Sequence, residues 1–273
     1  MRAQALIVAA ALGWVSTVSA EPAYPITVEA LHEPLGDIVR ARNEGGVPIS
    51  VILLLDASEN LATDAAWPVT AVIAPHSSAR LAQLSPAKAL ERWRYQYTWR
   101  YRPGAFNAVH DPKATYRLPY PENAKFPIVQ SALGPITTHT TADSRDAVDI
   151  SMPEGTPVLA AREGIVIHTA ADHRVGGMDE SLRSKANVVR IVHADGTIGN
   201  YAHLSYAGVV VRPGDFVRAG TLLGYSGTTG FSGGPHLHFG VTRVVRSGAD
   251  FDEVSVPFSF ASPAAEGTAR APR

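Results

Sequence analysis

The stretch Gly233-Gly234-Pro235-His236-Leu237-His238-Phe239 places two histidines two residues apart at the start of an expected strand. Residues i and i+2 of a strand point to the same face, with Cα atoms about 6.6 Å apart. At this spacing one imidazole can bind a metal ion while the other reaches a water molecule on that ion. Two half-buried histidines bonded to backbone carbonyls would give the same pattern, so the pair alone leaves a metal site and a structural role open.

The 273-residue sequence begins like that of an exported protein. Arg2 is the only charge in the first twenty residues, an apolar run spans residues 5–12, and Val18-Ser19-Ala20 has the small-x-small pattern of a signal-peptidase site. We therefore expect a signal peptide over residues 1–20. The periplasm is preferred over secretion, because no wall-anchoring motif or basic wall-binding tail is present. No later stretch has the roughly eighteen apolar residues that a transmembrane helix needs.

Charge and cysteine content exclude several classes of function. The formal net charge is −1, and the chain contains no cysteine. A nearly neutral chain gives no electrostatic basis for binding nucleic acid. Without cysteine there are no disulfides and no thiolate ligands, so any metal site must use histidine and carboxylate side chains.

The first part of the chain predicts a domain of strands over residues 21–119. Runs of β-branched and apolar residues give expected strands at 38–42, 49–55 and 69–73. Residues 93–101 alternate aromatic side chains with polar or cationic ones, which is typical of a half-buried strand whose rings line a sandwich core. A platform for glycans or nucleic acid is the alternative for these rings. Ser85 as N-cap and Pro86 at the first helical position predict one helical turn over 86–91.

Residues 120–258 have a different pattern, in which glycines interrupt short apolar runs. The expected strands lie at 157–161, 164–168, 187–193 and 222–225. Such short, regularly spaced strands predict a compact antiparallel fold. The chain as a whole is therefore expected to be all-β, with an N-terminal β-sandwich-like domain followed by a compact β-rich domain. Residues 259–273 are expected to be a disordered tail, because large apolar residues are missing from Ser262 onward.

A series of motifs follows in order between Phe126 and Val244. They are Asp149-Ile150-Ser151-Met152-Pro153-Glu154-Gly155-Thr156-Pro157-Val158, Ala161-Arg162-Glu163-Gly164, Asn187, Tyr201-Ala202-His203-Leu204, Gly214-Asp215-Phe216-Val217, Gly227-Thr228-Thr229-Gly230 and Pro235-His236-Leu237-His238-Phe239. In this order they resemble the catalytic domain of the lysostaphin/LytM-type zinc endopeptidases. The resemblance covers less than half of the chain. It implies a β-rich domain with a groove, a Zn²⁺ ion held by two histidines and an aspartate, and cleavage of peptide cross-links in bacterial peptidoglycan by a metal-activated water.

Position by position, the resemblance assigns four residues directly. Asp149 and His238 correspond to metal ligands, and His203 and His236 correspond to the two catalytic histidines that do not bind the metal. With a reference pKa of about 6.5, either of these histidines can exchange a proton near neutral pH. The sequence does not distinguish which of them is the base.

The third ligand departs from the family pattern. The family usually has its first histidine four residues before the aspartate, where this sequence has Arg145. A guanidinium has no lone pair for a metal. His139, ten residues before Asp149, is our candidate, because the polar loop between them could fold back. Asp143 is a rival carboxylate ligand, since it lies four residues after His139.

Two functions from other classes remain open. Arg145 at the usual histidine position is also compatible with a catalytically degenerate protein that binds cell wall or activates a partner cell-wall hydrolase. Residues 211–220 resemble a hairpin of biotinyl or lipoyl carriers, but the lysines of this half, Lys125 and Lys185, lack the expected surroundings.

Other conspicuous residues of this half are expected to be structural. His193 precedes the turn dipeptide Asp195-Gly196. The glycines at 227, 230, 233 and 234 are expected to shape the rim of the groove as scaffold.

Overall fold

The computed structural model describes residues 5–7, 24–132, 134 and 137–261. The chain forms two compact units, Met1–Val109 with Arg243–Val254, and His110–Thr242 with Ser255–Arg273. The second unit begins ahead of the expected boundary at residue 120, because Tyr116 is fully buried in its core. The division into domains 21–119 and 120–258 stays a prediction. Of the expected signal peptide, only residues 5–7 are described.

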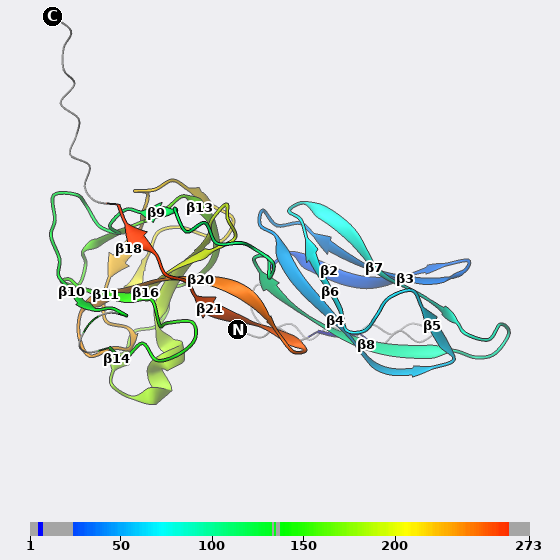
Figure 1. The fold of residues 1–273 in the computed structure, drawn as a ribbon. Helices are drawn as coiled ribbons and strands as arrows, with labels where there is room; N and C mark the ends of the chain where they lie inside the picture. Colours follow the sequence, from blue (N-terminus) through cyan, green and yellow to red (C-terminus); the bar gives the residue numbers. More distant parts are fainter. Residues whose placement is uncertain (1–4, 8–23, 133, 135–136, 262–273) are drawn as a thin grey trace, which may run out of the picture. The chain divides into compact units, whose positions relative to one another are not determined.

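Strands make up nearly all of the regular structure, which confirms the all-β expectation (Figure 1). The one helix among the described residues is the 3₁₀ helix η1 (Glu180–Lys185), where the Asp179 side chain accepts a hydrogen bond from the Ser181 amide. Within the described ranges, no helix has the length and hydrophobicity to cross a membrane.

The first unit consists mainly of two four-stranded sheets, in the orders β1-β8-β4-β6 and β2-β3-β7-β5. The two sheets form the sandwich-like arrangement that the sequence predicts, and the Tyr95 hydroxyl of one sheet donates to Asp37 of the other at 2.5 Å. The strands are β1 (Ala5–Ile7), β2 (Ile26–Glu33), β3 (Gly36–Asn43), β4 (Ile49–Glu59), β5 (Leu61–Thr63), β6 (Val69–Ile73), β7 (Ser77–Pro86) and β8 (Arg94–Pro103).

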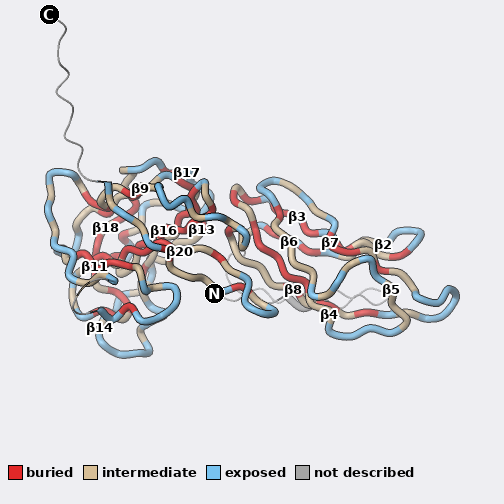
Figure 2. The backbone as a smooth tube through the Cα atoms, viewed as in Figure 1, coloured by how far each residue is buried: buried red, intermediate tan, exposed pale blue. Residues whose placement is uncertain are grey.

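The alternating aromatic segment forms β8, and its rings face the core. Tyr95, Tyr97 and Trp99 are buried, whereas the residues between them are only partly covered (Figure 2). Each fully buried aromatic side chain removes a large apolar area from water and contributes on the order of 2 kcal/mol to folding. The core interpretation of the rings is therefore confirmed, and a glycan or nucleic-acid platform on this strand face is not.

The expected helical turn over residues 86–91 is wrong. Ser85 and Pro86 continue β7, where they pair with Ala62 and Leu61 of β5. The following loop is held by Asn60, whose side chain accepts from the Lys88 amide and donates to the carbonyls of Lys88 and Arg92. Cross-strand pairing thus takes precedence over the local capping signal.

The first unit includes a second segment that is far from its other residues in the sequence. Residues 243–254, which include the end of β20 (His236–Ser247) and most of β21 (Asp250–Ser255), belong to this unit. Phe251 stacks on Phe106 with ring centroids 5.8 Å apart, and Arg100 forms an ion pair with Asp250 at 3.2 Å. The strand β20 is therefore shared between the two units.

The second unit is organised around one ten-stranded sheet whose main path is β10-β11-β20-β16-β15-β13-β17. The pairs in this sheet are antiparallel, as expected, while the small pairs β14–β19 and β22–β9 are parallel. Besides β20, the strands of the second unit are β9 (Thr115–Tyr116), β10 (Ile128–Gln130), β11 (Val148–Ser151), β12 (Pro157–Leu159), β13 (Gly164–Ala170), β14 (Gly176–Gly177), β15 (Asn187–Val192), β16 (Ile198–Val209), β17 (Phe216–Val217), β18 (Leu222–Ser226), β19 (Gly230–Phe231) and β22 (Ser259–Phe260).

The first residues of the expected tail form a strand. Ser259 and Phe260 pair with β9, and the Phe260 ring lies 5.8 Å from that of Phe239 in the core. An aromatic side chain that packs on a buried cluster offsets the entropy of ordering a short terminal strand. The remainder of the expected tail, residues 262–273, lies outside the described part of the chain.

His193 is structural, as its position before a hairpin turn predicts. Its ring is almost fully buried, Nδ1 donates to the Glu163 carbonyl at 2.7 Å, and Nε2 has no hydrogen-bond partner among the described residues. Burial disfavours the imidazolium and lowers the pKa of His193 to about 4. The folded protein therefore holds this ring neutral at pH values where the unfolded chain protonates it.

This buried ring predicts a pH-dependent stability. Between pH 6.5 and pH 4 the unfolded state binds more protons at His193, so stability is lost as the pH falls through this window. In urea unfolding without metal, the stability advantage of the wild type over His193→Asn should shrink by about 2 kcal/mol from pH 7 to pH 5. His32→Asn, which changes an exposed ring of the first unit, serves as the control. An advantage that is constant with pH would contradict the prediction.

Candidate metal centre

Three neighbouring strands bring the chemically important residues into one row. In β20, His238 lies opposite Asp149 of β11 on one side and opposite Ala202 of β16 on the other. His236 and His238 share one face of β20, as their spacing predicts. The intervening Leu237 and the following Phe239 are fully buried on the opposite face. The strand register thus places Asp149 directly beside the histidine pair.

His203 reaches the same face through a β-bulge in β16. Val188 pairs with Ala202 and Asn187 with Leu204, so His203 is an extra residue without a partner opposite. A regular strand would turn His203 away from the side that Ala202 shares with His238. The bulge instead gives His203 a φ of 63° and sets its ring centroid 4.5 Å from that of His236. This left-handed conformation costs roughly 1–3 kcal/mol in a residue other than glycine, so the surrounding structure must hold it.

His139 enters from the loop before β11. The loop is attached to the end of β21, where the Ser255 amide donates to the Ala142 carbonyl at 2.7 Å. The Ser255 hydroxyl also donates to Asp146 Oδ2 at 2.5 Å and accepts from the Asp146 amide at 3.2 Å. These bonds hold the loop between His139 and Asp149 in a folded-back conformation. The His139 side chain is only 6% exposed and lies beside Asp149.

The ligand atoms of His139, Asp149 and His238 form one group, all within 4.8 Å of one another. Asp149 Oδ1 lies 3.1 Å from His139 Nε2, 3.0 Å from His238 Nδ1 and 3.8 Å from His236 Nε2. The His139 and His238 rings are nearly perpendicular, with centroids 4.8 Å apart. One buried carboxylate oxygen is thus the common neighbour of three imidazoles.

The electrostatics of the group follow from this carboxylate. Burial raises the pKa of Asp149, but hydrogen bonds from His139 and His238 outweigh it and hold that pKa well below the usual range. For His139, burial lowers the pKa, and the bonds to Asp149 outweigh it, so the pKa is raised. Burial, together with the neighbouring His236, lowers the pKa of His203 to about 4. Asp149 is therefore anionic and His203 neutral at pH 7.

The donor set suits a divalent transition metal. Two imidazole nitrogens and one carboxylate oxygen form the ligand set of many catalytic zinc sites, in which ligand atoms about 2.0–2.2 Å from the ion lie close to each other. His139 Nδ1 donates to the Ala147 carbonyl at 3.1 Å, so a neutral His139 ring would offer the lone pair of Nε2 to a bound ion. Such an outer hydrogen bond fixes the tautomer and orientation of a metal-binding histidine.

The two other histidines are oriented in the same way. His203 Nδ1 donates to the Thr229 carbonyl at 2.7 Å, and His236 Nδ1 donates to the Gly234 carbonyl at 2.8 Å. Because a carbonyl can only accept, each neutral ring keeps its proton on Nδ1 and a lone pair on Nε2. Both Nε2 atoms are therefore available to take up a proton.

The rival ligand and the arginine at the usual histidine position lie outside the group. Asp143 is exposed, and its Oδ1 accepts a hydrogen bond from Thr141 at 2.5 Å within the loop. Arg145 is also exposed. Neither side chain belongs to the potential metal-binding group found among the described residues.

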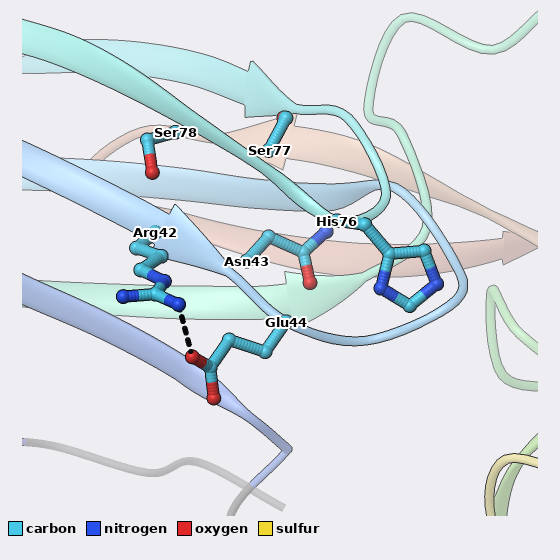
Figure 3. A pocket seen from close by; sticks show the side chains of 6 residues that line it. All are labelled: Arg42, Asn43, Glu44, His76, Ser77 and Ser78. Atoms are coloured by element: carbon cyan, nitrogen blue, oxygen red, sulfur yellow. Dashed lines mark ion pairs between the residues drawn. The ribbon is translucent and has the colours of Figure 1, made fainter.

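A surface pocket of the first unit is a different feature (Figure 3). It is lined by Arg42, Asn43, Glu44, His76, Ser77 and Ser78, none of which belongs to the group of His139, Asp149 and His238. Arg42 and Glu44 pair with each other at 2.9 Å, and the Asn43 amide donates to the Val47 carbonyl at 2.8 Å. Its charges are therefore satisfied internally.

Sequence reasoning missed the residues that support the histidines. Thr229 had no predicted role beyond its place in the Gly227-Thr228-Thr229-Gly230 motif, whereas its carbonyl orients His203. Gly227 permits a close approach, since a Cβ atom there would lie 2.7 Å from the Ser205 backbone. The Asp146–Ser255 contact joins residues more than a hundred positions apart, and no local pattern indicates it.

Comparison with known proteins finds one family over part of the chain. The model of peptidase family M23 matches residues 143–252. This segment is therefore similar to an M23 peptidase domain. The match includes Asp149, His203, His236 and His238, while His139 lies four residues ahead of it.

Several proteins are similar to this part of the chain. Lysostaphin of Staphylococcus simulans is 36% identical over 115 residues, which are 42% of this chain and 21% of lysostaphin. The peptidoglycan DD-endopeptidase ShyA of Vibrio cholerae is 33% identical over 124 residues, 44% of this chain and 26% of ShyA. A solved catalytic domain of S. simulans lysostaphin is 28% identical, with a TM-score of 0.31, over 51% of this chain and 85% of that one. The chain thus spans about a fifth to a quarter of these curated relatives.

The geometry predicts which substitutions abolish metal binding. His139→Ala, Asp149→Ala and His238→Ala should each weaken Zn²⁺ binding by more than about 100-fold, since the loss of outer-shell partners alone costs about 10–100-fold. Asp143→Ala should bind like the wild type. Metal content after dialysis and competition with a chromophoric chelator provide the measurement. Unchanged binding in His139→Ala, or lost binding in Asp143→Ala, would reject this ligand set.

The loop attachment predicts a smaller effect at a distance from the ligands. Ser255→Ala removes both hydroxyl bonds to Asp146 and should weaken Zn²⁺ binding about tenfold, because His139 is then held less firmly. Ser181→Ala, an exposed serine in η1, is the matched control. Equal affinities of the two variants would show that the attachment does not position His139.

Proposed function

We propose that this protein is a zinc-dependent endopeptidase that cleaves peptide cross-links of bacterial peptidoglycan. The observation that carries the proposal is the buried group of His139, Asp149 and His238, with two further imidazoles beside it, in a chain with an M23 domain. The relatives support the substrate class, since one is named a peptidoglycan DD-endopeptidase and another a DD-carboxypeptidase/endopeptidase. Export to the periplasm, with residues 1–20 as signal peptide, is part of the proposal.

Three side chains would hold the metal. His139 and Asp149 offer Nε2 and Oδ1, and His238 offers Nδ1, which leaves a coordination position for water or substrate. When bound, zinc polarises a peptide carbonyl and lowers the pKa of a coordinated water from about 15.7 to about 7. The charge of Asp149 offsets part of the charge of the ion, so the group retains a net positive charge that stabilises an oxyanion.

His203 and His236 would transfer protons. The free Nε2 of either ring can accept a proton from the attacking water, and the resulting imidazolium can donate to the oxyanion or to the leaving amine. The centroids of the two rings lie 4.5 Å apart. This proximity allows one ring to act as base while the other serves as a hydrogen-bonding partner.

The proposal is tested on purified sacculi. The protein should convert dimeric cross-linked muropeptides into monomers, and a chelator should abolish the release, which returns on addition of Zn²⁺. His203→Ala and His236→Ala should each slow release by about 10²–10⁴-fold while still binding zinc, because a proton-transfer group is lost and the ligands stay. His32→Ala, in the first unit, should release peptides like the wild type.

The opposite result has a definite meaning. If the zinc-loaded protein sediments with sacculi but releases no peptide, it is a cell-wall binding protein, and the endopeptidase proposal fails. Release that persists after complete removal of metal would contradict the zinc-dependent mechanism.

A further inference from the structure

We propose that Asn187 and Thr229 are positioning residues that hold the His203 ring in its catalytic orientation. This inference rests on the proposed function, because it assumes that His203 transfers protons. Asn187 is 0% exposed and Thr229 is 5% exposed. Neither side chain is a member of the metal-binding group.

The need for positioning comes from the bulge. His203 faces the metal-binding group only because β16 has one residue more than β15 at this point. A loss of the bulge would bring Asn187 opposite His203. The His203 side chain would then point to the other face of the sheet. The orientation of His203 therefore depends on whatever keeps Leu204, rather than His203, opposite Asn187.

The side-chain amide of Asn187 holds the strand immediately after the bulge. Its Nδ2 donates to the carbonyls of Leu204 at 3.3 Å and Ser205 at 3.2 Å. The same nitrogen donates to the His173 carbonyl at 2.9 Å, and Oδ1 accepts from the His173 amide at 3.0 Å. A buried amide with this many partners fixes the backbone around it, because moving that backbone away would leave the buried amide without its partners.

Thr229 completes the support and connects it to the ring. Its hydroxyl accepts from the backbone amide of Asn187 at 2.9 Å and donates to the Leu204 carbonyl at 2.8 Å. Its own carbonyl accepts from His203 Nδ1 at 2.7 Å. One residue thus holds the backbone after the bulge and, through a different group, sets the tautomer of the ring.

The support of His203 and the metal-binding group lie on different elements. Asn187 starts β15 and Thr229 precedes β19, whereas the candidate ligands come from β11, β20 and the loop before β11. A substitution in the support should therefore change proton transfer without changing metal affinity. A general loss of structure would change both.

The test uses a pair of substitutions at position 229. Thr229→Val keeps the shape but removes the hydroxyl, and Thr229→Ser keeps the hydroxyl. On a soluble cross-linked muropeptide, Thr229→Val should lower kcat by about 10- to 100-fold with KM within about threefold, and Thr229→Ser should recover most of that loss. Zn²⁺ affinity should stay within about threefold in both variants.

A matched control removes a buried hydroxyl elsewhere in the same unit. Thr197 is fully buried, and its hydroxyl donates to Asp195 at 2.7 Å, within the hairpin that follows His193. Thr197→Val should lower thermal stability and leave kcat unchanged. Asn187→Ala is the second variant of the support and should reproduce the kcat loss of Thr229→Val if it folds.

A spectroscopic readout makes the test independent of activity. In protein labelled with ¹⁵N-histidine, the His203 ring of the wild type should show a single neutral form with the proton on Nδ1. Thr229→Val should give a mixture of the two tautomers or a broadened signal, and Thr229→Ser should restore the single form. If the wild type releases no peptide, the proposed function fails, but this spectrum still decides whether the support orients His203.

Three outcomes would overturn the inference. The first is a wild-type His203 spectrum together with wild-type kcat in Thr229→Val. The second is an equal loss of kcat in the valine and serine variants, because the hydroxyl would then be irrelevant. The third is a parallel loss of Zn²⁺ affinity and kcat, which would mark general destabilisation.

Discussion

The pairing of Asp149 with His238 across β11 and β20 is the contact on which the candidate site depends. The strand register sets these residues directly opposite, so their side chains meet without any loop having to order itself. A buried carboxylate is costly unless it is paired and hydrogen-bonded. Here three imidazoles lie within 4 Å of one carboxylate oxygen, and a divalent ion would satisfy the same oxygen more completely. The remaining features of the site can be understood as ways of bringing further imidazoles to this carboxylate.

The sequence predicted the sheet framework well where apolar runs were regular. The expected strands at 49–55, 69–73 and 164–168 lie within β4, β6 and β13, and all three are runs rich in β-branched and apolar residues. The strand β7 was missed, since Ser77–Pro86 is polar and ends in a helix-capping signal. Its identity as a strand comes from pairing with β3 and β5, which no local pattern records.

Sequence reasoning selected residues that lie together in the candidate site, but it did not predict what supports them. His139, Asp149, His203, His236 and His238 were all selected from motif order and chemistry, and they lie together. The reasons for their orientation escaped prediction, because they are backbone carbonyls and a bulge. A carbonyl has no residue-type signature, and the bulge at His203 follows from the register of two strands. The position of His139 was inferred as a fold-back of the loop, but the attachment to Ser255 that stabilises this arrangement joins segments far apart in sequence.

The strand that carries His236 and His238 also determines how the molecule can be divided. Residues 236–242 of β20 belong to the second unit and residues 243–247 to the first, and the chain then returns to the second unit at Ser255. No single cut in the backbone yields two complete units. A fragment that starts at residue 110 would retain Phe251 but lose Phe106, its stacking partner, and would leave Asp250 without the guanidinium of Arg100. Genetic separation of the peptidase half would therefore require the 243–254 hairpin to be shortened or redesigned with polar residues.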